Sequence, residues 1–204
     1  MEAQSEVNTH AKMHKLDPNG DVIFEIAGQK LLLCSKAMSL ASPAFKAMFK
    51  PQYLEGQNLS SEQPPVIVIL EDEYQPFDSM LTLLHHQTVN ISDAADLLDV
   101  CLLADKWRCL EAIKAQVLYF MHVMADEDDE YDDERPLERC VQLFVAAYIV
   151  RDRKMVDLQT MRMAVNATPG TSYPSMGLTK WSHVVPDLAW GKCSEPADSS
   201  NILI

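Results

Sequence analysis

Glycine is scarce in this sequence, and the motifs that depend on clustered glycines are missing. Only six glycines occur among 204 residues and none cluster, so no Gly-rich loop is available to cradle a phosphate. No Gly-x-Ser-x-Gly motif marks the nucleophile of a hydrolase. We therefore expect a protein without catalytic residues and without a bound cofactor.

Long apolar runs are also lacking. No stretch approaches the roughly 18 apolar residues of a membrane-spanning helix. Residues 1–16 are polar and lack the apolar centre of a secretory signal peptide, so we expect a flexible N-terminus there. These absences predict an intracellular protein, cytoplasmic or nuclear, with no membrane partner.

Basic side chains are few. The chain has 17 Lys and Arg against 30 Asp and Glu, a net charge of −13. Because phosphate binding needs clustered Lys and Arg, we expect no nucleic-acid partner. Residues 126–134 are all acidic except Tyr131. Like charges this close repel one another, so this acidic run is predicted to be a flexible, solvated loop.

Candidate metal ligands are present, but their spacing is poor. The five cysteines show no short metal or redox spacing and are expected to be small buried apolar side chains. His85 and His86 are adjacent, point in different directions on a helix and predict a solvated helix end. Acidic residues from Asp126 onward mimic calcium-loop positions, but Tyr131 stands where the loop needs Gly and Leu137 stands where it needs a bidentate Glu. We therefore expect no metal site.

The first third of the chain has the pattern of a hairpin followed by short helices. Val22, Phe24 and Ile26 alternate with Ile23 and Glu25, and this period of two predicts a strand. Gly28 lies in a turn, and residues 31–34 are interpreted as the returning strand. Ser35 is expected to cap a short helix over 36–40.

A second helix start follows directly. Ser42 supplies a capping hydroxyl, and Pro43 takes the first helical position, where a missing N–H has no consequence. Phe45 and Phe49 then fall on one apolar face, together with Met48.

The middle of the chain predicts a loop, one strand and a series of helices. Residues 51–64 are polar and are expected to be a loop, with Gly56 at a turn of positive φ. Residues 66–70 form a continuous, mostly β-branched run, so both faces of this strand should be covered. Pro76 opens a third helix. Later helices are predicted after Ser92, Arg108, Pro136 and Asp152.

These elements predict an α+β fold, with a small three-stranded sheet flanked by a helical cluster and followed by C-terminal helices. The expected divisions are a flexible N-terminus (1–16), a main domain (17–122), an acidic linker (123–135), a helical extension (136–168) and an irregular tail (169–204).

Several short motifs occur in the order and spacing of one family. They are Asp21-Val22-x-Phe24, Ser42-Pro43-x-Phe45-x-x-Met48-Phe49, Leu54-Glu55-Gly56-Gln57, the strand 66–72 and Ala104-Asp105-Lys106-Trp107. With them, residues 17–122 resemble the BTB/POZ domain, in the compact form common in fungal proteins. The segment 145–152 is similar to the helical extension of many fungal members.

The resemblance implies fold-forming rather than reactive roles for the motif residues. Trp107, at a turn between helices, is expected to plug the corner that the helices make. The full predicted set is Asp21, Phe24, Ser42, Pro43, Phe45, Phe49, Gly56, Asp105 and Trp107.

The resemblance also implies a non-catalytic protein–protein interaction module. The expected partners are proteins, either a second copy of the chain in a homodimer or a different protein. Contacts are expected from exposed apolar residues near the first helices and the third helix. Cys34 and Ser35 stand where some relatives carry His and a basic residue of a charged pocket, which weakens an expectation of corepressor binding.

An alternative function is a substrate adaptor for a cullin-type ubiquitin ligase, with a cullin as partner. Residues 136–166 could supply the helices that follow the domain in such adaptors. No convincing apolar-x-Glu motif stands between Phe77 and Asn90, although Leu70-Glu71-Asp72-Glu73 lies close by.

Overall fold

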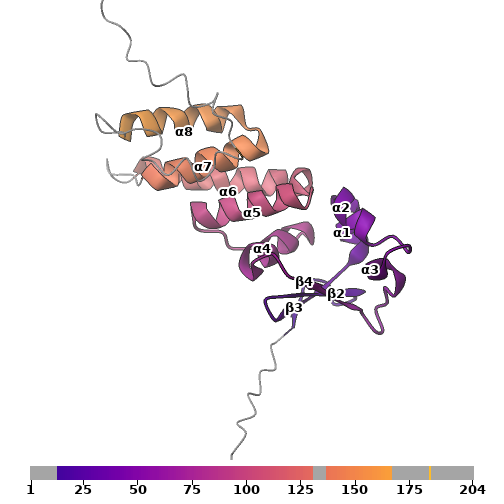
Figure 1. Cartoon of the computed structure of the whole chain (residues 1–204). Helices are drawn as coiled ribbons and strands as arrows, with labels where there is room; N and C mark the ends of the chain where they lie inside the picture. The colour runs from indigo at the N-terminus through magenta and orange to yellow at the C-terminus, as the bar shows by residue number, and fades with distance from the viewer. Residues whose placement is uncertain (1–12, 131–136, 167–183, 185–204) are drawn as a thin grey trace, which may run out of the picture. The chain divides into compact units, whose positions relative to one another are not determined.

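The computed structural model of the chain describes residues 13–130, 137–166 and 184, and it contains two compact units. One unit comprises residues 1–91 and 102–117, and the other comprises 92–101 and 118–204. Figure 1 labels the helices and the strands β2, β3 and β4. The strands are β1 (His14–Lys15), β2 (Val22–Ile26), β3 (Gln29–Leu33) and β4 (Val66–Ile69). The helices are α1 (Ser35–Ala41), α2 (Pro43–Met48), α3 (Leu54–Gln57), α4 (Tyr74–Leu84), α5 (Ala94–Lys106), α6 (Leu110–Glu130), α7 (Leu137–Val150) and α8 (Arg153–Asn166).

The sheet of the first unit is mixed, with the strand order β1-β3-β2-β4. β2 and β3 form the predicted antiparallel hairpin, with Phe24 opposite Leu31. β1 runs parallel to β3, and β4 runs parallel to β2. The α+β class is confirmed. The described chain has four strands rather than the predicted three, because β1 is only two residues long and leaves no periodic pattern.

The N-terminal segment is docked from residue 14 onward, which differs from the flexible stretch predicted over 1–16. Leu16 is only 2% exposed, and its N–H donates to the carbonyl of Leu32 at 3.0 Å. One apolar side chain and a short parallel ladder are enough to fix this segment, and neither has a sequence signal that a pattern search can detect.

The hairpin turn consists of Ala27 and Gly28, both with positive φ, at 48° and 78°. Positive φ at both central residues is the mark of a type I′ turn, whose twist suits two-residue hairpins. Gly28 adopts this conformation without steric cost, whereas Ala27 carries a Cβ that disfavours it.

Three helix predictions need correction or refinement. Ser35 does not cap α1: it is the first helical residue, and the cap position is Cys34. The predicted loop 51–64 contains the short helix α3. α6 continues to Glu130, so the first part of the acidic run is helical rather than a loop. Residues 131–134 of that run lie outside the described residues, as does the predicted tail apart from residue 184.

The second unit includes the helices predicted as an extension. α7 and α8 pack against each other and lie side by side in Figure 1. A helix follows Asp152 as predicted, and Asp152 caps it, because its Oδ1 accepts from the N–H groups of Lys154 and Met155. Arg139 of α7 and Arg162 of α8 each donate a hydrogen bond to a backbone carbonyl of α6.

The cysteines inside the described ranges are free thiols, and three of the four are buried as expected. Burial raises the pKa of Cys101 and of Cys109 to about 12, so both thiols stay protonated near neutral pH. Cys34 is half-buried, and Cys193 lies outside the described residues.

Candidate protein-docking surface

Large apolar side chains are exposed at two places in the first unit. On the helices, Leu40 of α1 is 78% exposed and Leu54 of α3 is 81% exposed, and Tyr53 precedes α3 with 48% exposed. The third predicted helix, α4, offers no such residue because its apolar side chains are buried. Exposed apolar residues therefore lie near the first helices, as expected. Near the third helix, Leu70 precedes α4 and is 87% exposed. That these residues contact a partner stays a prediction.

The second exposed place is β4. Val66 and Val68 are 48% and 56% exposed, and Leu70, directly after the strand, is 87% exposed. β4 was predicted to be covered on both faces, which is wrong. The apolar run suggested an interior strand, but β4 lies at the edge of the sheet and one of its faces is open.

Five aromatic side chains from distant parts of the sequence form the centre of the first unit. Phe45 stacks on Trp107 with ring centroids 4.8 Å apart. Phe24 lies about equally far from Phe45, Phe49 and Phe77, at 6.1 to 6.2 Å between centroids. Because the rings come from β2, α2, α4 and the turn after α5, this aromatic cluster holds the sheet and the helices together. Trp107, at the turn after α5, contacts the rings of Phe45 and Phe77.

Ser42 joins a helix start to the same turn. Its Oγ accepts from the N–H groups of Ala44 and Phe45 at 3.0 and 3.1 Å, which caps α2, and Pro43 occupies the first helical position. The Ser42 hydroxyl also donates to the carbonyl of Trp107 at 2.6 Å. The cap was predictable from the local sequence, whereas the bond to Trp107 was not.

Asp72 is the anchor that the sequence did not reveal. Its carboxylate accepts from Lys106 Nζ at 2.6 Å and from Trp107 Nε1 at 3.2 Å, with the Asp72 side chain only 6% exposed. Two bonds to one buried carboxylate, one of them an ion pair, tie the end of β4 to the end of α5. In the sequence, Asp72 was only one of three acids that end a strand.

Asp21 supplies the cap that Ser35 was expected to supply. The Asp21 carboxylate accepts from the Ser35 N–H at 2.7 Å and from the Ser35 hydroxyl at 2.6 Å. An anion at the N-terminus of a helix satisfies free N–H groups and complements the helix dipole. The opening strand and α1 are thus linked by a charge-assisted pair.

The two remaining motif residues behave differently from expectation. Gly56 does not have a positive φ, and Gly28 is the positive-φ glycine of the described chain. Gly56 is needed because a Cβ there would lie 2.3 Å from the Lys50 carbonyl oxygen. Asp105 is exposed, and its carboxylate has no hydrogen bond or ion pair within the described ranges, although its backbone carbonyl accepts from Arg108.

A histidine predicted to be solvated proves to be fully bonded. His85 Nε2 accepts from the Cys34 N–H at 3.1 Å, so the proton sits on Nδ1 and is donated to the Leu81 carbonyl at 2.8 Å. Burial lowers the pKa of His85, because the charged form would lose its hydration. His86 is exposed with a φ of 56°, so only the second of the two histidines is at a solvated helix end.

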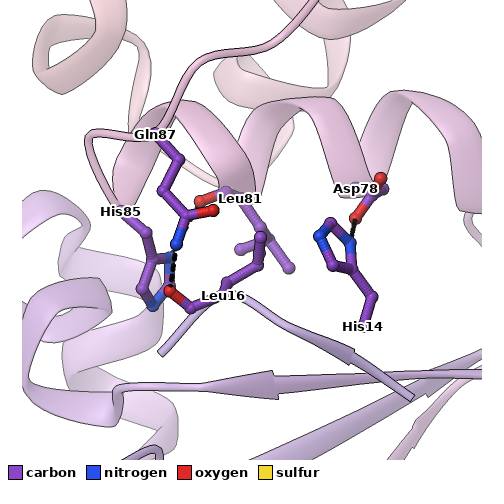
Figure 2. Close-up of polar contacts among 6 residues, drawn as sticks. All are labelled: His14, Leu16, Asp78, Leu81, His85 and Gln87. Atoms are coloured by element: carbon purple, nitrogen blue, oxygen red, sulfur yellow. Dashed lines mark hydrogen bonds and ion pairs between the residues drawn. The ribbon is translucent and has the colours of Figure 1, made fainter. Parts of the chain in front are cut away.

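Figure 2 shows how the N-terminal segment is held on α4, next to His85. His14 Nδ1 lies 2.7 Å from Asp78 Oδ1, and the Gln87 side-chain amide donates to the Leu16 carbonyl. With Leu16 buried between these contacts, the segment is attached to the body of the unit at three points.

A family model matches the part of the chain that contains the sheet, the aromatic cluster and the first helices. The BTB/POZ domain family model matches residues 12–122, more than half of the chain. The chain belongs to the BTB/POZ family. No curated protein matches the chain.

BTB/POZ domains mediate protein–protein interaction, so the exposed apolar side chains of this BTB/POZ domain are its candidate contacts. The described residues contain no group of three or more His, Cys, Asp or Glu side chains that could hold a metal ion. Among the helices that the structure describes, none is long and apolar enough to cross a membrane.

Proposed function

We propose that this BTB/POZ chain is a non-catalytic docking module that self-associates or binds a second protein through the exposed apolar side chains of α1 and α3. The observation that carries the proposal is the exposure of Leu40 and Leu54, at 78% and 81%. Burying a leucine side chain contributes about 1.5–3 kcal/mol, so two such residues supply a useful share of an interface.

The buried polar groups of this unit support a structural rather than a catalytic role. The bonded carboxylates of Asp21 and Asp72 and the imidazole of His85 all have partners within the fold. Catalytic groups would instead converge on a cleft with free hydrogen-bonding capacity. An intracellular location, cytoplasmic or nuclear, remains a prediction of the sequence.

Self-association is tested by light scattering on the purified full chain over a range of concentrations. We expect the wild-type mass to rise toward that of a dimer and the double variant Leu40→Gln/Leu54→Gln to dissociate at least about tenfold more readily. The matched control is Met161→Gln, which removes a side chain that is 61% exposed on α8 and should leave the mass unchanged. If the wild-type chain stayed monomeric at all concentrations, self-association would be ruled out, and docking of a different protein would be the remaining proposal.

A second candidate function is a substrate adaptor for a cullin-type ubiquitin ligase. Two observations favour it: a packed helical pair, α7 and α8, follows the matched domain, and Leu70 and Glu71 are exposed after β4. A pull-down with purified cullin should then retain the wild-type chain and lose the variant Leu70→Ser/Glu71→Lys. Failure of the wild-type chain to bind the purified cullin would count against the adaptor function.

A further inference from the structure

The free edge of β4 is the least protected backbone in the described sheet. β4 pairs with β2 on one side and is the last strand of the order β1-β3-β2-β4. The Ile23 N–H donates to the Pro65 carbonyl, and residues along a strand present their backbone groups to alternate edges. The N–H and C=O groups of Val66 and Val68 therefore point to the free edge. An edge with unpaired groups is a ready template for another strand.

The side chains along this edge do not block it. Natural edge strands are usually protected by an inward charge, a lysine, a bulge or a proline. In this chain Pro64 and Pro65 stand before the strand and acids stand after it, but Val66 to Ile69 contains no charge and no proline. The exposed Val66, Val68 and Leu70 are two residues apart, so they lie on one face beside the open backbone.

Charge distinguishes between the possible occupants of this edge. Glu62 lies before β4, and Glu71 and Glu73 follow it; all three are exposed, with no ion pair in the part of the chain that the structure describes. If two copies paired antiparallel through Val68, Glu73 of one copy would lie beside the segment Glu62–Gln63 of the other. That geometry brings like charges together at both ends of the paired strands. A second copy is therefore disfavoured, and basic residues at both ends of an added strand are favoured.

We propose that the free edge of β4 binds an extended segment of another protein by β-strand addition, with apolar residues at alternate positions and Lys or Arg at the ends. Main-chain hydrogen bonds to Val66 and Val68 provide the attachment, and the basic ends select the partner through Glu62, Glu71 and Glu73. This inference rests on the proposed docking function, and it assigns a chemical class of partner to a surface different from that of Leu40 and Leu54.

The test uses a synthetic heptapeptide, Lys-Val-Thr-Val-Thr-Val-Lys with blocked ends, titrated into the full chain by fluorescence anisotropy. Two matched peptides accompany it: one with Glu at both ends, and one with N-methyl groups on the amides of one edge. We expect the Glu peptide and the N-methylated peptide to bind at least about tenfold more weakly. Equal binding of the N-methylated peptide, or no binding of the Lys peptide, would overturn the inference.

A variant of the protein gives an independent readout. In Val68→Pro, an outward N–H is lost while the bonds to β2 remain, because proline is tolerated where the N–H faces solvent. We expect about tenfold weaker binding of the Lys peptide. Bound Lys peptide should protect the Val66 N–H from hydrogen exchange in the wild type, and this protection should be lost in Val68→Pro. Should Val68→Pro misfold, Val68→Lys places a charge on the same edge and is expected to have the same effect, and Val68→Thr should bind normally.

The peptide experiment can fail separately from the proposed function. If the wild-type chain forms a dimer that Leu40→Gln/Leu54→Gln disrupts, but no peptide binds, the strand-addition inference is wrong and the docking function stands. If Val68→Pro disrupts the dimer and the Lys peptide does not bind, the edge is occupied by a second copy, and our choice of partner is overturned.

Discussion

At the scale of single residues, Ala27 has a backbone conformation that does not suit its side chain. Ala27 has a φ of 48° in the hairpin turn, whereas its neighbour Gly28, at 78°, suits its position. Gly adopts positive φ readily because it has no Cβ, and Asn does so because its polar side chain can bond locally. Ala has a Cβ and no polar side chain, so positive φ is less favourable for it. The turn is exposed, so nothing else constrains Ala27.

Replacing Ala27 should therefore stabilise the protein. We expect Ala27→Asn to raise the free energy of unfolding by about 0.5–1 kcal/mol, measured by urea denaturation. The matched opposite change is Gly28→Ala, where a Cβ would meet nothing within 4 Å and only the backbone is strained. That variant should lose about 1 kcal/mol. A destabilised Ala27→Asn would show that the turn is not of type I′.

His85 makes the stability of the first unit depend on pH. Burial lowers the pKa of His85 below 6.5 in the folded state. As the pH falls below 6.5, His85 therefore binds a proton more readily in the unfolded chain than in the folded chain. Stability from this residue is therefore fully present above pH 6.5 and is lost as the pH falls through the folded pKa. Protonation would also remove the acceptor at Nε2 for the Cys34 N–H.

We expect the free energy of unfolding to fall between neutral pH and about pH 5, and to fall less in His85→Gln than in the wild type. Urea denaturation at several pH values measures both slopes. His86→Gln, which changes the exposed neighbour, should keep the wild-type slope. If His85→Gln and the wild type showed the same pH dependence, the loss of stability at low pH would come from other titratable groups.

At the scale of elements, local signals were predictable and long-range ones were not. The start of α2 at Ser42 and Pro43 was predictable because capping depends on residues within one turn. β1 was missed because two residues paired with a distant strand leave no pattern. The coverage of β4 was misjudged because an apolar run does not reveal whether a strand lies inside a sheet or at its edge.

The docking of the N-terminal segment can be measured directly. Leu16 is 2% exposed, so we expect Leu16→Ala to lower the free energy of unfolding by about 2–3 kcal/mol. The matched control is Leu54→Ala, because Leu54 is 81% exposed and its loss should change stability by less than about 0.5 kcal/mol. Urea denaturation measures both variants. If Leu16→Ala were as mild as the control, the segment would not be docked in solution.

At the scale of the whole molecule, the sequence was sufficient to predict the α+β class and the family. Several motif residues, such as Phe24 and Phe45 of the aromatic cluster, lie in the core, and the packing of the core determines the fold. The region of the first helices was predictable as a candidate surface, but its exposed residues were not, because the same residue types occur in the core and on the surface. Met38 of α1 is fully buried, whereas Leu40 of the same helix is 78% exposed.

The bonds of Asp72 have a consequence for the entropy of binding at the neighbouring edge. Lys106 and Trp107 hold Asp72, shortly after β4, and β4 is paired with β2 along its length, so the empty edge is already held in an extended conformation. A template held in this way loses little conformational freedom when a strand is added, and the ordering penalty then falls on the incoming segment. A partner whose segment is extended before it arrives would therefore bind more tightly than a disordered one of the same sequence.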